Sequence, residues 1–80
     1  DINKRVRRIF REVAISIEDS ENIIVIKTLE GAAQAVAAVL DDLAWPEVVG
    51  SLAGDDTIFL IVKPTQCVHE VMARLNRFRM

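Results

Sequence analysis

The chain has 80 residues, of which 51% are hydrophobic, with 10 Lys or Arg against 12 Asp or Glu. This composition predicts one small globular domain and excludes a disordered or multidomain chain. The single cysteine, Cys67, excludes an internal disulfide, and together with the single His69 it supplies too few ligands for a closed zinc site. Because a domain this short buries only about 60% of its unfolded surface, we expect it to gain stability by oligomerising.

The charge is distributed unevenly along the chain. Residues 1–11 carry +4, residues 12–66 carry −8 and residues 67–80 carry +2. The basic N-terminal segment is compatible with contacts to nucleic acid phosphates and equally with a solvated linker or helix end. It has no initiator Met and no apolar signal segment, so we expect a piece of a longer chain with a partner domain elsewhere. The longest apolar run, Ile58–Val62, is far shorter than the roughly 20 residues of a membrane span.

The first half of the chain predicts a hairpin followed by a helix. A period of two, typical of a half-buried strand, places Val13, Ile15 and Ile17 on one face and small or polar residues on the other. A turn at 19–22 then leads to the β-branched run at 23–26. Alanine-rich composition predicts a helix over 31–43, which ends before Pro46. The core stripe of this helix is Val36, Val39, Leu40 and Leu43.

A second hairpin and a second helix follow. Runs at 48–53 and 57–63 are typical of strands, and Gly54-Asp55-Asp56 is short enough to join them. Pro64 ends the last strand, and Thr65 is the predicted N-cap of the helix that follows. The apolar face of that helix consists of Val68, Val71, Met72, Leu75 and Phe78.

The order β-β-α-β-β-α predicts a two-layer α+β fold, with a mostly antiparallel four-stranded sheet and both helices on one face. The runs 23–26 and 58–62 are apolar at successive positions, so these strands carry hydrophobic side chains on both faces. Two helices cover only one face. We therefore expect the uncovered face to be an apolar interface of a homo-oligomer.

Polar groups cluster at two places. Asp55 and Asp56 form either a turn that bonds its own backbone or a cation site, for which a planar guanidinium suits paired carboxylates better than a metal lacking a third acid. Gln34 and Asp41 lie two helical turns apart, so they flank small alanines that leave room for a ligand or a closely packed helix. Gly31, at the predicted helix start, leaves amides free for an anion such as an α-carboxylate.

Groups for catalysis are few. Cys67 and His69, two residues apart on a helix, do not face each other, so no Cys-His dyad is predicted. The serines lack a nucleophile elbow, and neither a phosphate-binding glycine loop nor an RNA-stacking motif is present. We therefore predict that the protein is not an enzyme.

Three segments together resemble the C-terminal domain of the bacterial arginine repressor. These segments are Thr28–Gln34 (TLEGAAQ), the helix through Leu40 and Asp41, and Val49–Thr57 (VGSLAGDDT). The resemblance runs from about residue 12 to the end. It implies an L-arginine-sensing domain of a cytoplasmic repressor of arginine biosynthesis and catabolism genes, which forms trimers that stack into hexamers with arginine between them.

The resemblance also implies the domain limits and the partners. Residues 12–80 would be the arginine-binding and oligomerisation domain, and residues 1–11 the linker from an N-terminal domain that binds operator DNA. DNA would be contacted through that other domain and not through this one. L-arginine would be the co-repressor, with no other cofactor, no metal and no membrane partner.

The residues implied to bind L-arginine are Gln34, Asp41, Ser51, Ala53, Asp55 and Asp56. The two adjacent carboxylates would hold guanidinium and amino groups, one of them reaching a ligand bound mainly by the opposite trimer. Ala53 would act through its backbone, and Ser51 stands where threonine is frequent in the family. Three alternatives stay open: a sensor of another amino acid, a constitutive oligomerisation module, and a small enzyme of related architecture using Asp55 or Asp56.

Overall fold

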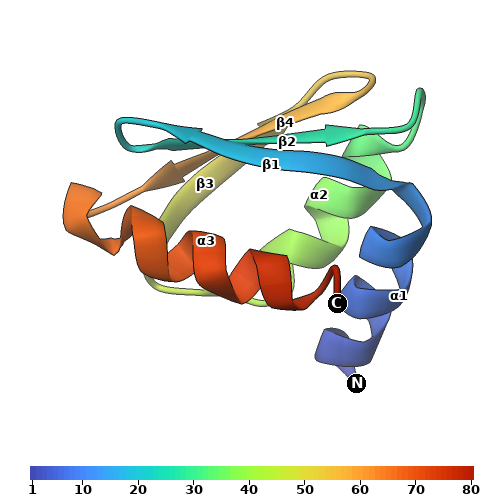
Figure 1. The fold of residues 1–80 in the computed structure, drawn as a ribbon, viewed down its shortest axis with the longest axis horizontal. Coiled ribbons are helices and arrows are strands. Elements are labelled where there is room, and N and C mark those ends of the chain that lie inside the picture. Colours follow the sequence, from blue (N-terminus) through green and yellow to red (C-terminus); the bar gives the residue numbers. More distant parts are fainter.

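The computed structural model describes residues 1–80 as three helices under one sheet (Figure 1). The elements in chain order are α1 (Ile2–Val13), β1 (Ala14–Ser20), β2 (Ile23–Thr28), α2 (Ala33–Asp41), β3 (Val48–Ala53), β4 (Thr57–Val62), a 3-10 turn (Thr65–Cys67) and α3 (Val68–Arg77). All helices lie on one side of the sheet. The predicted two-layer α+β fold is therefore confirmed, with α1 as an addition.

The sheet has the strand order β1-β2-β4-β3, and every neighbouring pair is antiparallel. The central strands β2 and β4 pair Ile24 with Leu60 and Ile26 with Ile58, and these four side chains are buried toward the helices. Antiparallel partners share a face, so this register fixes which side of the sheet forms the core. The edge strand β3 lies beside β4 at one border of the domain.

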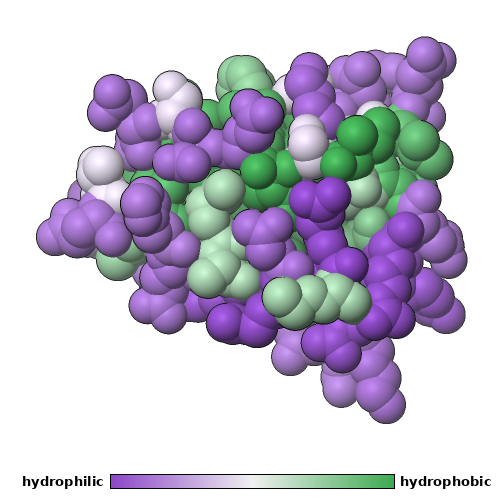
Figure 2. All heavy atoms as spheres, viewed as in Figure 1, coloured by the Kyte–Doolittle hydropathy of each residue, from purple (hydrophilic) through white to green (hydrophobic).

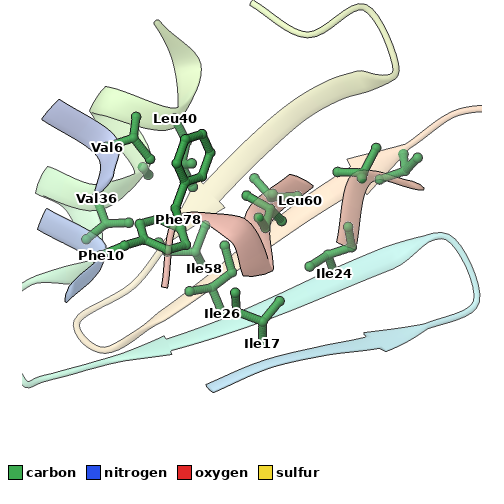
Figure 3. Close-up of a cluster of buried hydrophobic side chains, with 14 of the residues drawn as sticks. Val6, Phe10, Ile17, Ile24, Ile26, Val36, Leu40, Ile58, Leu60 and Phe78 are labelled. Atoms are coloured by element: carbon green, nitrogen blue, oxygen red, sulfur yellow. The ribbon is translucent and has the colours of Figure 1, made fainter. Parts of the chain in front are cut away.

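The core is a single cluster of 16 buried hydrophobic residues between the sheet and the helices (Figure 3). From α2 it contains Val36 and Leu40, and from α3 it contains Val68, Val71 and Leu75. The predicted apolar faces of both helices are thus confirmed, with Val39, Leu43 and Met72 packing partly buried against the cluster.

α1 is a third helix that the six-element order did not contain. The Asp1 carboxylate accepts a hydrogen bond from the Lys4 backbone amide at 2.9 Å, which caps its N-terminus. Val6 and Phe10, one turn apart, are 0% and 1% exposed in the core. Residues 2–11 are therefore part of the packed fold. Whether they also connect to a preceding domain stays a prediction.

Three local details differ from the expectations. A β-bulge at Ile15 breaks the predicted alternation, because Ala14 pairs with Thr28 while Ser16 pairs with Lys27, and Ile15 is left 54% exposed. Thr65 does not cap the last helix. It lies in the 3-10 turn, and Cys67 occupies the N-cap position without a side-chain hydrogen bond.

The predicted start of α2 at Gly31 was also wrong. Gly31 has φ +79°, a left-handed conformation that cannot open a right-handed helix but suits glycine in the preceding turn. The helix begins two residues later, at Ala33, and ends at Asp41.

The second face of the sheet is apolar and uncovered, as expected. We call it the outer face; it consists of Ile23, Val25, Leu52, Phe59 and Ile61. Leu52 is 75% exposed and Phe59 45% exposed. Figure 2 views the sheet nearly edge-on, with hydrophobic and hydrophilic atoms mixed over the strands and hydrophilic atoms predominating over α1. An exposed apolar surface of this kind usually marks an interface.

Candidate functional site

The acidic turn between β3 and β4 is fixed by main-chain hydrogen bonds to two other elements. The Asp55 carbonyl accepts from the Ala33 amide at 3.2 Å, and the Asp56 carbonyl accepts from the Thr28 amide at 2.8 Å. Across the turn itself, the Gly54 amide donates to the Thr57 carbonyl at 2.9 Å. The turn is thereby held against the start of α2 while both carboxylates remain exposed to solvent.

The two carboxylates have different surroundings. Asp56 Oδ1 accepts a hydrogen bond from Thr57 Oγ1 at 2.8 Å, and Lys27 Nζ donates to that same hydroxyl at 2.9 Å. Asp55 has neither a side-chain hydrogen bond nor an ion pair. The turn therefore offers one oriented carboxylate and one unengaged carboxylate, side by side.

A second polar contact lies at the other end of α2. Ser51 Oγ donates to Asp41 Oδ1 at 2.8 Å, linking the last residue of the helix to the edge strand. Ser51 pairs with buried Leu60 and Ala53 with buried Ile58, so both β3 side chains are on the helix side of the sheet. Asp41 is thus oriented by Ser51, and its other oxygen has no partner.

The six predicted site residues therefore lie along one border of the domain, where α2 runs beside β3. Asp55 and Asp56 lie at the N-terminal end of the helix, and Asp41 with Ser51 lies at its C-terminal end. Gln34 is exposed in the first turn of α2 and makes no side-chain hydrogen bond. Seven residues separate Gln34 from Asp41, a rise of about 10 Å along the helix. The border is open, and no pocket encloses all six residues.

This geometry leaves fewer free main-chain amides for the anion site that was predicted at Gly31. The first helical amide, that of Ala33, already donates to the Asp55 carbonyl. An incoming α-carboxylate therefore meets fewer free amides here than an ordinary helix N-terminus presents.

A cavity of about 200 Å³ lies next to Asp41, and sequence reasoning missed it. Apart from Asp41 its walls are apolar or glycine, and include Leu40, Trp45, Val48 and Leu75. Seven of the nine lining residues lie in the stretch 40–50, and Leu60 of β4 and Leu75 of α3 complete the wall from positions remote in sequence. The single tryptophan of the sequence, Trp45, is the one large aromatic residue in this wall.

Trp45 is held in place by a charged pair. Arg74 makes two hydrogen bonds to Glu47, at 3.0 and 2.7 Å, and its guanidinium carbon lies 5.1 Å from the Trp45 ring centroid. Trp45 also stacks on Phe78 with 6.1 Å between ring centroids. The hydrogen bonds from Arg74 lower the pKa of Glu47 from 4.5 to about 2, and the same pairing raises the pKa of Arg74.

No group of three or more His, Cys, Asp or Glu side chains is arranged to hold a metal ion. Cys67 is half-buried at the start of α3 and His69 is exposed. None of the helices has the length and apolarity needed to span a bilayer.

Comparison with known proteins gives one consistent result. Residues 10–77 match the family described as arginine repressor, C-terminal domain. The chain is 51% identical over 73 residues to the arginine repressor of Symbiobacterium thermophilum and 55% identical over 75 residues to that of Moorella thermoacetica. It is 47% identical over 75 residues to the arginine repressor of Carboxydothermus hydrogenoformans.

These alignments cover 91%, 94% and 94% of the chain but only 49%, 48% and 50% of the three relatives. The chain thus spans about half the length of the curated relatives it matches.

Proposed function

The chain belongs to the arginine repressor C-terminal domain family, and from that premise we propose that it is the L-arginine-sensing, hexamer-forming effector domain of a transcriptional repressor. The genes controlled would be those of arginine biosynthesis and catabolism. Operator DNA would be recognised by the half of the protein that this chain does not span. A regulatory domain of this family is not an enzyme.

The main observation in support of arginine as the ligand is the pair of carboxylates at the β3–β4 turn. The Asp55 carboxylate is exposed and unpaired beside the Asp56 carboxylate, which Thr57 orients. Two carboxylates at one turn repel each other, and a cationic ligand removes that repulsion. A guanidinium presents five donors in a planar fork, so it satisfies both carboxylates where an ammonium satisfies fewer oxygens.

The openness of the border supports binding between copies of the chain. Gln34, Asp41 and Asp55 are all exposed, so one copy alone leaves a bound arginine largely in solvent. A second copy facing this border would enclose the ligand and strengthen its ion pairs by excluding water.

This arrangement gives a mechanism by linkage. An arginine that contacts two trimers binds the hexamer better than separate trimers, so mass action shifts the assembly toward the hexamer. The DNA-binding halves are then presented in a fixed arrangement. Because coupling free energy is reciprocal, operator DNA should also tighten arginine binding in the complete protein.

A second candidate is a constitutive oligomerisation module without a ligand. The exposed outer face favours it, because that apolar surface would associate whether or not arginine is present. The two candidates differ in one measurable respect, the response of the protein to arginine.

Thermal unfolding with and without L-arginine tests the proposal. At about 100 times the dissociation constant, binding adds about 2.7 kcal/mol of stability, which raises Tm by about 10 °C or more for a domain of this size. L-citrulline should give a much smaller shift, because its neutral ureido group leaves the carboxylates without a cation. Absence of any arginine shift would favour the constitutive module, and an equal citrulline shift would contradict the role of the carboxylates.

Asp55→Asn should remove the arginine-induced shift while leaving the Tm without ligand nearly unchanged, because the Asp55 side chain has no partner in the fold. Asp19→Asn is the matched control. It makes the same charge change on an exposed residue of β1, the strand at the opposite border of the sheet, and should keep the full shift.

A further inference from the structure

The solvent side of α1 carries a continuous basic strip that the arginine site does not use. We call it the basic face; it consists of Lys4, Arg7, Arg8 and Arg11. At 3.6 residues per turn these positions fall within an arc of about 100°, opposite the buried Val6 and Phe10. All four are exposed and together line one shallow depression, with Glu12 as the only acid at its border.

The basic face is not neutralised by the rest of the protein. The ion pairs of the molecule involve Arg5 and Arg74, with Asp42 3.6 Å from Arg5, and none involves the four residues of the basic face. Arg11 Nε and Nη2 both donate to the main-chain oxygen of Met80. The strip thus keeps its positive charge although residues 12–66 carry −8. A separation of charge this strong directs a polyanion to one face.

The dimensions of the strip suit the backbone of a duplex. From residue 4 to residue 11 the helix rises about 10 Å, and duplex DNA carries about three phosphates per strand over that length. A membrane surface is a poorer fit, because an interfacial helix must insert its apolar face and that face of α1 is buried in the core. Single-stranded nucleic acid is also a poorer fit, since no exposed aromatic side chain lies on this helix for base stacking.

We propose that the basic face of α1 binds the phosphate backbone of double-stranded DNA without reading its sequence. The choice of duplex DNA rests on the proposed function of the protein as a repressor. Phosphate contacts position a protein on DNA, whereas base contacts specify the sequence. This domain therefore contributes affinity and orientation, and base reading is left to the other half of the protein. This proposal departs from the expectation that DNA is contacted only outside this domain, and the experiment below decides between the two.

Fluorescence anisotropy of the 80-residue chain with two labelled 20-bp duplexes of unrelated sequence tests this proposal. Both duplexes should bind equally, and log K should fall linearly with log salt at a slope of about −0.9 per phosphate contacted. Arg7→Ala/Arg8→Ala should reduce that slope by about 2. Between 50 and 200 mM salt, the affinity of the unsubstituted chain should therefore fall about tenfold more than that of the double variant.

Arg5→Ala/Lys63→Ala is the matched control, because it removes the same charge at exposed positions outside the basic face. It should leave the salt slope unchanged. An equal loss in the control, or no binding of either duplex at low salt, would overturn the proposal. So would tighter binding to a single strand of the same length, or binding to vesicles containing anionic lipid that the double variant loses.

The arginine-induced Tm shift, measured on the same double variant, separates this proposal from the proposed function. The shift should persist, since α1 contributes no residue to the arginine site. If DNA binding behaves as expected while arginine has no effect on either protein, the basic face stands and the arginine assignment fails.

Discussion

At the residue scale, the Glu47–Arg74 pair makes the stability of the protein depend on pH. The pKa of Glu47 is about 2 in the folded protein and 4.5 for the unperturbed group. The folded state therefore holds the proton less tightly than the unfolded state. The contribution of this pair is fully present above pH 4.5 and is lost as the pH falls toward 2.

Glu47→Gln should thus lower Tm above about pH 5, and the difference from the unsubstituted protein should vanish near pH 2. Measuring Tm of both proteins from pH 7 to pH 2 checks this, because the two proteins differ only in the group at position 47. Glu70→Gln is the control: its carboxylate is 3.6 Å from Arg74 and 67% exposed, so its removal should change Tm little. A Glu47→Gln difference that persists unchanged at pH 2 would contradict the assignment.

Individual contacts at the site lay beyond sequence reasoning. The family resemblance supplied Asp41 and Ser51 as neighbours of one ligand, but ten residues of separation give no physical signal of their 2.8 Å hydrogen bond. Only the register of β3 against β4 turns Ser51 toward α2. The place of Trp45 in the cavity wall depends on Leu75 of α3, which is remote in sequence.

At the element scale, α1 should contribute to the stability of the domain, because it supplies Val6 and Phe10 to the core. Phe10 is 1% exposed and lies edge-on to Phe78, with 5.8 Å between ring centroids. Phe10→Ala leaves a cavity at the junction of α1 and α3 and should cost about 3–5 kcal/mol, lowering Tm by more than about 10 °C. Denaturant unfolding followed by circular dichroism measures this loss.

Arg8→Ala, on the solvent side of the same helix, is the control for helix propensity and should change stability by no more than about 0.5 kcal/mol. If Phe10→Ala were as harmless as Arg8→Ala, residues 1–11 would behave as a linker, as the resemblance implied, and not as part of the core.

The elements that sequence patterns predicted well are those with a clear run or period. Strands β3 and β4 follow from short runs typical of strands on either side of Gly54-Asp55-Asp56, and the apolar faces of α2 and α3 follow from i, i+3, i+4 spacing. α1 has the same kind of signal in Val6 and Phe10, but five of residues 1–11 are basic, a composition equally compatible with a solvated linker. The bulge at Ile15 was unpredictable because it depends on where β2 ends its pairing.

At the scale of the whole molecule, the three helices cover only one face of the sheet and leave the outer face exposed. Phe59 lies at the centre of the outer face, between Val25 on β2 and Leu52 on β3. These three side chains stay partly or largely exposed. A small domain buries a low fraction of its surface, so leaving apolar side chains exposed limits its stability. Association of copies through this face would add the burial that the single chain lacks.

Phe59→Lys should therefore convert an oligomer into a monomer while the fold is kept, because the substituted side chain points away from the core. Sedimentation over a range of concentrations measures the mass. Ile15→Lys is the control: it adds the same charge at a position 54% exposed, on β1 at the opposite border from β3. Since arginine is proposed to bind between copies, Phe59→Lys should also weaken the arginine-induced Tm shift. A monomeric mass for the unsubstituted chain at every concentration would contradict an interface on this face, and an unchanged oligomer in Phe59→Lys would locate the interface elsewhere.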